Sequence, residues 1–282
     1  MKIAIIGLGL IGGSMAKAIK KNTKYPLYAY DINKAAVSAA IQQEAIDGGF
    51  DLDELCTFDL VILGLYPDVT IDFVKKYAES FKKGAVVIDT CGVKNIVVEA
   101  CERVLNENGV SFLGCHPMAG REYSGFEYSL DNLFEKASFI YTPTENTPEA
   151  VVRFVTNFAK EIGFLRCTKA TPKEHDEVIA FTSQLAHVVS SAYIKSPSLV
   201  KQFGFSAGSF KDLTRVAKLN EGMWTTLFLM NKEPLVEEID QIIYHLKEYR
   251  EAIANDDEKT LCELLKNGRK LKEYSNDKNS EY

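Results

Sequence analysis

The stretch from residue 3 to residue 14 constrains the fold more than any other part of the chain. It reads Ile-Ala-Ile-Ile-Gly-Leu-Gly-Leu-Ile-Gly-Gly-Ser. The β-branched run is typical of a buried parallel strand. Of the glycines that follow, Gly7 permits a tight turn, Gly9 lets the backbone approach a pyrophosphate, and Gly12 lets a helix pack against the strand. A helix over residues 14–20 would point its N-terminal amides at the phosphates, so we predict a dinucleotide site here.

A signal peptide is the alternative interpretation, because Lys2 precedes an apolar run and Ala16-Lys17-Ala18 resembles a cleavage site. The next predicted strand, residues 27–30, decides between the two. It ends in Asp31, nineteen residues after Gly12, where a carboxylate binds the 2′-hydroxyl of an adenosine ribose. The sequence therefore favours dinucleotide binding. A carboxylate repels a 2′-phosphate, and Lys34 alone could partner one, so NAD is favoured over NADP.

Composition excludes several classes of protein. The 282 residues suffice for two domains, and a hydrophobic fraction of 46% is ordinary for a globular chain. The net charge of −6 and the lack of a long basic run argue against nucleic acid or an anionic membrane as a partner. No apolar segment is long enough to span a bilayer. The six cysteines form no C-x-x-C pair, which indicates reduced thiols in a cytoplasmic protein, and the four histidines are too dispersed to predict a metal site.

Strands and helices alternate after Asp31. Strands are predicted over residues 59–65, 85–89 and 110–114, with helices over 35–43, 69–78 and 96–105 between them. This rhythm is typical of a doubly wound parallel sheet, in which ligands bind beyond the carboxyl ends of strands. That rule places one residue after each of five strands on a common rim. For Pro67 and Asp89, simple turn chemistry is an equally good explanation. The predicted rim residues are Gly7, Asp31, Pro67, Asp89 and His116.

The character of the sequence changes near residue 170. Strands over residues 138–142 and 164–168 flank a helix over 148–162, and helical periodicity dominates from Pro172 onward. We predict an α/β Rossmann-like domain over residues 1–170 and an all-α domain over 171–282. One long helix over 173–195 carries few charges and should be buried. A helical domain of this size could complete its core with a second copy, which favours a homodimer. The tail after Ser275 is expected to fray.

His116 is the first candidate for chemistry. It lies in Gly-Cys-His-Pro-Met-Ala-Gly, residues 114–120, just past a predicted buried strand. A histidine titrates near neutral pH and can accept the proton of an alcohol while hydride leaves the same carbon. The alternative is a loop histidine with purely local hydrogen bonds. Its place on the predicted cofactor rim favours catalysis.

Two further groups of polar residues are predicted on helices. Asp176, Ser183 and His187 are spaced by seven and four residues, which puts them on one stripe, either as an active-site wall or as an internal hydrogen-bond network. The adjacent His175 would face a neighbouring chain or solvent. In the helix over 210–217, Arg215 is the candidate clamp for a substrate carboxylate, with Asp212 one turn earlier to orient it. A surface Arg–Asp pair is the alternative.

These motifs resemble the monofunctional prephenate dehydrogenases of tyrosine biosynthesis. The resemblance is carried by residues 7–14, by 114–120 followed by Ser-Gly-Phe-Glu-Tyr-Ser at 124–129, by Ser-Gln-Leu-Ala-His at 183–187, and by 210–217 followed by Met223-Trp224. It runs from residue 1 to about residue 275, with no room for a C-terminal regulatory ACT domain.

The resemblance implies oxidative decarboxylation of prephenate to 4-hydroxyphenylpyruvate, with NAD as the cofactor, and the dispersed histidines predict no metal. It makes His116 the base, Arg215 the carboxylate clamp, Ser183 and His187 a wall, Trp224 an aromatic near the substrate, and Arg121 and Glu122 a gate. Together with Asp212, these residues form the predicted catalytic and substrate-binding set. The predicted cofactor-binding residues are Gly7, Leu8, Gly9, Leu10, Ile11, Gly12, Tyr30, Asp31, Leu65, Pro67 and Asp89.

The sequence departs from the family pattern at three positions. Gly92 stands where the family often has a serine whose hydroxyl orients the histidine, so that role is empty or moved to Thr90. Ala186 replaces a common proline, and Gln184 stands where some members have histidine, so we assign Gln184 no proton transfer. Arogenate, which carries an amino group, is an alternative substrate that no motif separates from prephenate. A non-catalytic, NAD-sensing dimer is a third interpretation, and the pairing of His116 with Arg215 argues against it.

Overall fold

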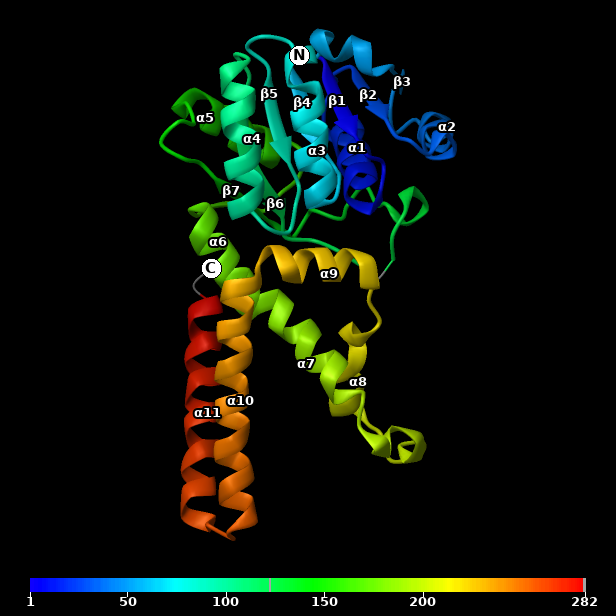
Figure 1. Cartoon of the computed structure of the whole chain (residues 1–282). Helices are drawn as coiled ribbons and strands as arrows, with labels where there is room; N and C mark the ends of the chain where they lie inside the picture. Colours follow the sequence, from blue (N-terminus) through cyan, green and yellow to red (C-terminus); the bar gives the residue numbers. More distant parts are fainter. Residues whose placement is uncertain (122, 281–282) are drawn as a thin grey trace. The chain divides into compact units, whose positions relative to one another are not determined.

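The computed structural model describes residues 1–121 and 123–280, except the side chains of residues 279 and 280 (Figure 1). The chain separates into two compact units. The first covers Met1–Lys232, and the second begins at Glu233. The boundary predicted near residue 170 falls inside the first unit and stays a prediction.

The first unit is built on an eight-stranded sheet with the strand order β3-β2-β1-β4-β5-β6-β7-β8. The pairs from β3 to β6 are parallel, β7 runs antiparallel to β6, and β8 is parallel to β7. The predicted doubly wound fold is therefore confirmed, and the two-residue β3 is an addition to it. The strands are β1 Ile3–Ile6, β2 Leu27–Tyr30, β3 Gly48–Gly49, β4 Leu60–Leu63, β5 Val86–Asp89, β6 Ser111–Pro117, β7 Ser138–Thr142 and β8 Arg166–Lys169.

Helices cover both faces of this sheet (Figure 1). Alternate residues of each central strand face opposite layers, so Ile3 and Ile5 join the core under α1 and α5, whereas Ala4 and Ile6 join the core under α3 and α4. Both faces are thus apolar, as buried parallel strands require. The helices are α1 Leu10–Asn22, α2 Lys34–Gln42, α3 Pro67–Tyr77, α4 Asn95–Glu107 and α5 Glu149–Glu161, with short 3₁₀ turns at Leu52–Thr57, Ala78–Ser80 and Phe126–Tyr128.

Four helices complete the first unit. They are α6 Pro172–Ile179, α7 Leu185–Tyr193, α8 Gly208–Thr214 and α9 Glu221–Met230, with 3₁₀ turns at Pro197–Lys201 and Arg215–Ala217. The helix predicted over 173–195 is interrupted by a π-helical turn, Ala180–Gln184. Its expected burial is also wrong for the single chain, since Val178 is 58% and Phe181 60% exposed.

The second unit is a pair of helices, α10 Lys232–Ala254 and α11 Glu258–Ser280. The Tyr249 hydroxyl of α10 donates to the carbonyl of Leu264 in α11 at 3.3 Å, and the Asp257 carboxylate caps α11 by accepting from the amide of Thr260. The tail predicted to fray after Ser275 is instead helical to Ser280.

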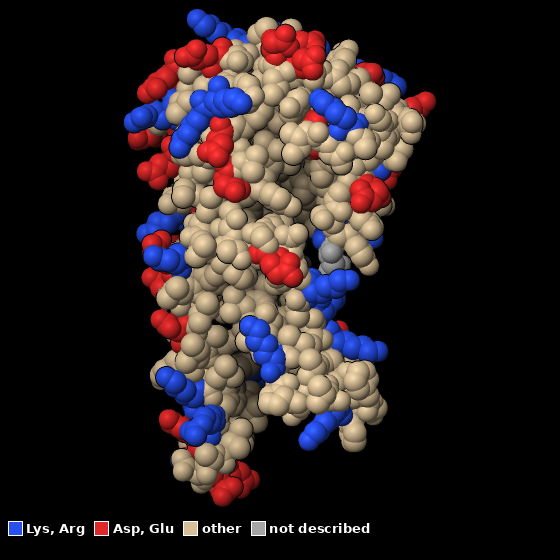
Figure 2. All heavy atoms as spheres, turned by 45° about the vertical axis from the view of Figure 1, so that its right-hand side comes forward, with Lys and Arg blue, Asp and Glu red and all other residues tan. Residues whose placement is uncertain are grey.

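Charges of both signs are interspersed over the face shown in Figure 2. No basic stripe of the kind that tracks a nucleic-acid backbone stands out there. Among the described residues, no helix is both long and apolar enough to cross a membrane.

Three glycines bring the first strand, the first helix and β4 into contact where the strand order reverses. A Cβ added at Gly12 would lie 1.9 Å from the Gly7 carbonyl oxygen, and one at Gly64 would lie 2.8 Å from the same oxygen. Gly7 itself has a φ of 93°, which side-chain-bearing residues rarely adopt. Backbone packing at this switch point therefore requires glycine, while a Cβ at Gly9 would meet nothing within 4 Å.

We expect Gly12→Ala to lower the free energy of unfolding by about 3 kcal/mol, because backbone atoms would have to move to admit the methyl group. Gly9→Ala is the matched control and should cost less than about 1 kcal/mol. Urea denaturation of both variants measures the difference. Equal stabilities would show that the close approach of residues 7 and 12 is not tight.

Candidate active site

The turn after β1 forms one end of the site. Gly9 is the N-cap of α1 and offers no side chain to the amides of the first helical turn, so they are open to an anion. The Asp31 carboxylate, at the end of β2, accepts from the amide of Leu8 at 2.6 Å and from that of Asn33 at 2.7 Å. The predicted acid thus braces the glycine turn, and a carboxylate oxygen can still accept from a ribose hydroxyl.

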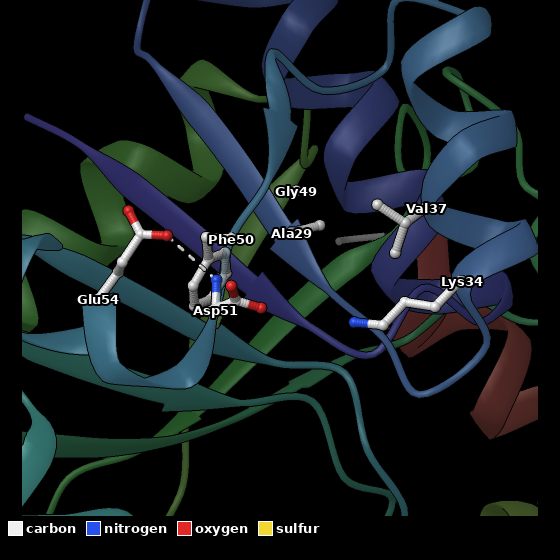
Figure 3. A pocket seen from close by; sticks show the side chains of 7 residues that line it. All are labelled: Ala29, Lys34, Val37, Gly49, Phe50, Asp51 and Glu54. Atoms are coloured by element: carbon white, nitrogen blue, oxygen red, sulfur yellow. Dashed lines mark hydrogen bonds between the residues drawn. The ribbon is translucent and has the colours of Figure 1, made fainter.

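A pocket lies between α2 and the segment after β3, with Ala29 of β2 in its lining (Figure 3). At the margin of the pocket, the Lys34 ammonium lies 4.7 Å from the centre of the Tyr30 ring. The Glu54 carboxylate accepts from the amide of Asp51. Two carboxylates therefore accompany the single lysine, which disfavours an additional phosphate in this neighbourhood. The pocket is lined by Ala29, Lys34, Val37, Gly49, Phe50, Asp51 and Glu54.

The end of β4 supplies the opposite side of the turn. Leu65 lies against Gly7, since one of its methyl carbons is 2.9 Å from the position of an added Cβ there. Pro67 is buried at the first position of α3, where proline is favoured because no intrahelical donor is lost. Leu65 is half-buried, so it can face a ligand, whereas the contribution of Pro67 is mainly to start the helix.

Asp89, at the end of β5, lies below the rim and not on it. The residue is fully buried and forms an ion pair with the equally buried Lys94. Its two oxygens also accept from the amides of Cys91 and Cys115, each at 2.9 Å. Burial alone would lower the pKa of Lys94, but the Asp89 carboxylate outweighs it and holds the pKa above its usual value. The direct cofactor contact expected of Asp89 is replaced by an internal pair that ties β5 to β6 and to the start of α4.

His116 is held by a buried chain of hydrogen bonds. It lies within β6, opposite Ile140 of β7, and not past the strand as predicted. Its Nδ1 is 2.9 Å from Nε2 of His175, whose Nδ1 is 2.7 Å from the Asp176 carboxylate. His175 is only 2% exposed, which corrects the expectation that it faces solvent or a neighbouring chain.

Electrostatics keep both imidazoles neutral. Burial lowers the pKa of His116 well below 6.5, and positive charge on a protonated His175 or on Lys94 acts in the same direction. Burial likewise lowers the pKa of His175, although the Asp176 carboxylate acts in the opposite direction. A neutral His116 can accept a proton at neutral pH.

The Asp176 carboxylate is fixed by the N-terminus of α4. It accepts from the amides of Lys94 at 2.7 Å and Asn95 at 2.8 Å, a favourable place for a negative charge at a helix N-terminus. Asp176 therefore belongs to an internal hydrogen-bond network, the alternative to an active-site wall for this residue. The π-helical turn changes the phase of the helix after it, so Asp176, Ser183 and His187 do not form the regular stripe predicted.

In that turn, Gln184 and not Ser183 takes the buried position. Its amide accepts from Asn231 at 2.8 Å and donates to the Leu227 carbonyl at 3.3 Å. Asn231 also donates to the carbonyl of Asp176 at 2.9 Å. Ser183 is half-buried beside this network. A π-helical turn often marks a functional site, and the sequence carried no signal for it.

A second group of residues lies around His187. Its Nδ1 is 3.0 Å from the Val216 carbonyl, and its ring centre is 3.7 Å from that of Trp224. Burial lowers the pKa of His187, and so does the positive charge of Arg215. The structure therefore gathers three of the predicted residues, His187, Arg215 and Trp224, although they come from three separate elements.

Helix α9 connects the two groups. A Cβ added at Gly92 would lie 3.4 Å from a Leu227 methyl carbon and 4.0 Å from both Cε1 and Nε2 of His116. Leu227 is one turn after Trp224. Thr90 does not take the role left by the missing serine, because its hydroxyl donates to the Leu63 carbonyl at 3.1 Å. The His116 ring is hydrogen-bonded to His175 instead.

The remaining predicted residues are less constrained. Arg121 is exposed, donates to the Tyr128 carbonyl at 3.2 Å and lies over the Tyr123 ring. Asp212 is exposed on α8, one turn before Arg215. Glu122 lies outside the described residues. Within the described part of the chain, no cluster of three or more His, Cys, Asp or Glu residues is placed to hold a metal ion.

Comparison with known families gives two matches. Residues 15–165 match the nucleotide-binding domain of prephenate dehydrogenase, and residues 171–267 match the prephenate dehydrogenase dimerization domain. A prephenate dehydrogenase of Lactococcus lactis is 31% identical to the chain, covering 96% of it and 77% of the relative.

Solved structures agree with these matches. A prephenate dehydrogenase of Aquifex aeolicus, in complex with hydroxyphenyl propionate and NAD⁺, superposes with a TM-score of 0.88 at 33% identity, covering 97% of this chain and 98% of that one. A Synechocystis arogenate dehydrogenase superposes with a TM-score of 0.83 at 25% identity, covering 98% of this chain and all of the other.

We expect Lys94→Met to lower the free energy of unfolding by about 3–5 kcal/mol, because the Asp89 carboxylate would stay buried without its counter-charge. Lys82→Met is the control, since it removes an exposed partner of Asp59 and should cost less than about 1 kcal/mol. Denaturant titrations at neutral pH measure both. A small effect at Lys94 would mean that the two backbone amides suffice to hold Asp89.

Proposed function

The chain belongs to the prephenate dehydrogenase family, and we propose that it catalyses the NAD-dependent oxidative decarboxylation of prephenate to 4-hydroxyphenylpyruvate. The observation that carries the proposal is the placement of His116. Its Nδ1 is bound by a buried histidine, and its Nε2 faces Gly92 in the loop after β5, at the carboxyl end of the parallel strands. A neutral base in this position suits proton removal from an alcohol beside a nicotinamide.

The glycine turn and Asp31 fit NAD. The open space at Gly9 and the amides at the start of α1 suit a pyrophosphate, and the carboxylate suits an unphosphorylated ribose. The match to a nucleotide-binding domain and the NAD⁺ in the Aquifex structure support this assignment. When bound, NAD accepts a hydride.

The chain's own residues account for the rest of the reaction. His116 accepts the proton of the ring hydroxyl at Nε2 as the hydride leaves that carbon, and loss of the ring carboxylate as carbon dioxide makes the ring aromatic. Arg215 binds a carboxylate of the substrate and thereby holds the reacting carbon in place. His187, Trp224 and the half-buried Ser183 form the wall beside it. Arg121, Glu122 and Asp212 complete the proposed substrate-binding set.

Arogenate is a second candidate substrate, because the Synechocystis arogenate dehydrogenase covers nearly the whole chain in the structural comparison. It differs from prephenate by an amino group on the side chain. The proposed chemistry at His116 is the same for either substrate, since the ring is common to both.

We further propose that the chain works as a homodimer in the cytoplasm. Large apolar side chains are exposed between residues 178 and 205, and they lie in the part of the chain that matches a dimerization domain. Burying such side chains against a second copy removes apolar surface from water. All six cysteines are free thiols, as a reducing compartment allows. The most exposed of these apolar residues are Val178, Phe181, Val200, Phe203 and Phe205.

We expect reduced nicotinamide to form when the enzyme is mixed with prephenate and NAD, with NADP much less effective because of Asp31. Parallel assays with arogenate compare kcat/KM for the two substrates and identify the preferred one. Binding of NAD without turnover of either cyclohexadienyl acid would contradict the proposed function and favour a non-catalytic sensor.

We expect His116→Asn and Arg215→Gln to affect different kinetic constants. Asparagine keeps a donor for His175 but removes the base, so kcat should fall by about 10²–10⁴-fold while the affinity for NAD is retained. Because the pKa of His116 is lowered, the acid limb of kcat/KM in the wild type should lie below pH 6.5. Loss of the guanidinium should raise KM by at least about tenfold with a smaller effect on kcat. Near-normal turnover of the first variant, or an unchanged KM of the second, would remove the corresponding assignment.

A further inference from the structure

The hydrogen-bond chain behind His116 has a defined direction of donation. The Asp176 carboxylate can only accept, and it already accepts from the amides of Lys94 and Asn95. The Nδ1 of His175, 2.7 Å away, must therefore carry the proton of that hydrogen bond. In a neutral imidazole, the other nitrogen is then an acceptor. Nε2 of His175 is thus an acceptor aimed at His116.

The same logic applies to the next imidazole. Nδ1 of His116 lies 2.9 Å from the accepting nitrogen of His175, so it must carry a proton. Nε2 of a neutral His116 is then an unprotonated acceptor. This nitrogen lies near Gly92, 4.0 Å from the position of an added Cβ there, and a Leu227 methyl carbon lies 3.4 Å from the same position.

We propose that His175 and Asp176 are a positioning pair that holds His116 as its Nδ1–H tautomer and thereby leaves Nε2 ready to accept the substrate's proton. The second part of this inference rests on the proposed function, whereas the first concerns the protein alone. In this chain the pair holds Nδ1 of His116 through a hydrogen bond. The residue near Nε2 is Gly92, which has no side chain to orient the ring from that side.

The surroundings of the pair support a specific orientation. Asp176 is held by the first amides of α4, and its backbone carbonyl accepts from Asn231, so both ends of the residue are anchored. The charged groups near the two imidazoles are Asp176 on α6, Lys94 before α4 and Asp89 on β5. Lys94 and Asp89 neutralise each other, which leaves the Asp176 carboxylate to set the direction of donation.

The direct test is nitrogen NMR of the full-length protein with ¹⁵N-labelled histidine rings, with the four histidines assigned by single substitutions. At neutral pH, His116 and His175 should both be protonated at Nδ1 and unprotonated at Nε2. His175→Leu removes the acceptor, and His116 should then become a mixture of tautomers. His175→Gln places an amide oxygen near the former Nε2 and should restore the Nδ1–H form of His116.

Kinetics provide a second readout. We expect His175→Leu to lower kcat by about 10- to 100-fold, with KM and NAD affinity within about threefold of wild type, and His175→Gln to recover most of the rate. The acid limb of kcat/KM should move to lower pH in His175→Leu, because protonated His116 loses the accepting nitrogen that stabilises its Nδ1–H. A purely structural role would not move this limb. His245→Gln, at an exposed residue of α10, is the control and should change neither readout.

Several results would overturn the proposal. They are an Nε2–H tautomer of His116 in the wild type, an unchanged tautomer in His175→Leu, or equal impairment by leucine and glutamine. If the leucine variant does not fold, the wild type and the glutamine variant still decide, because both must show the Nδ1–H form. A wild type that turns over neither prephenate nor arogenate would refute the proposed function alone, since the NMR measurement needs no substrate.

Discussion

The carboxylate of Asp176 joins the parts of this molecule on which the site depends. It lies at the start of the helical segment, yet its oxygens accept from the first amides of α4, a helix that packs on the sheet. A buried carboxylate is stable only when its lone pairs are used, and here two amides and an imidazole use them. The same interaction therefore docks α6 against the sheet and orients the histidine pair.

The buried Asp89–Lys94 ion pair stabilises the same region of the structure. It joins the ends of β5 and β6 to the start of α4, so the strand that carries His116 and the helix that binds Asp176 are fixed by adjacent polar contacts. Burying these charged and polar groups costs free energy unless each one has an ion-pair or hydrogen-bond partner. This requirement favours one arrangement of the side chains in this region. His116 is thus held at Nδ1 by His175, and its Nε2 lies near Gly92.

Sequence reasoning located most of the elements and the residues of the site. The β-branched runs, the glycine spacing and Asp31 predicted the doubly wound sheet, because strand and turn preferences are local properties. The two-residue β3 at Gly48–Gly49 was missed, since a pair of glycines carries no strand signal. The π-helical turn at Ala180–Gln184 was missed because it depends on the contacts of Gln184 with Asn231 and Leu227, which are distant in sequence.

The sequence by itself determined the nucleotide-binding turn, the order of strands and helices, and the identity of His116 and Arg215 as candidates, because each of these follows from residue type and short-range spacing. Only the tertiary structure decided that His175 is buried behind His116, that Asp89 faces inward, and that Trp224 and His187 are in contact. These outcomes depend on which side chains from separate elements satisfy one another once water is excluded. That pairing is a property of the packed chain and leaves no periodicity in the sequence.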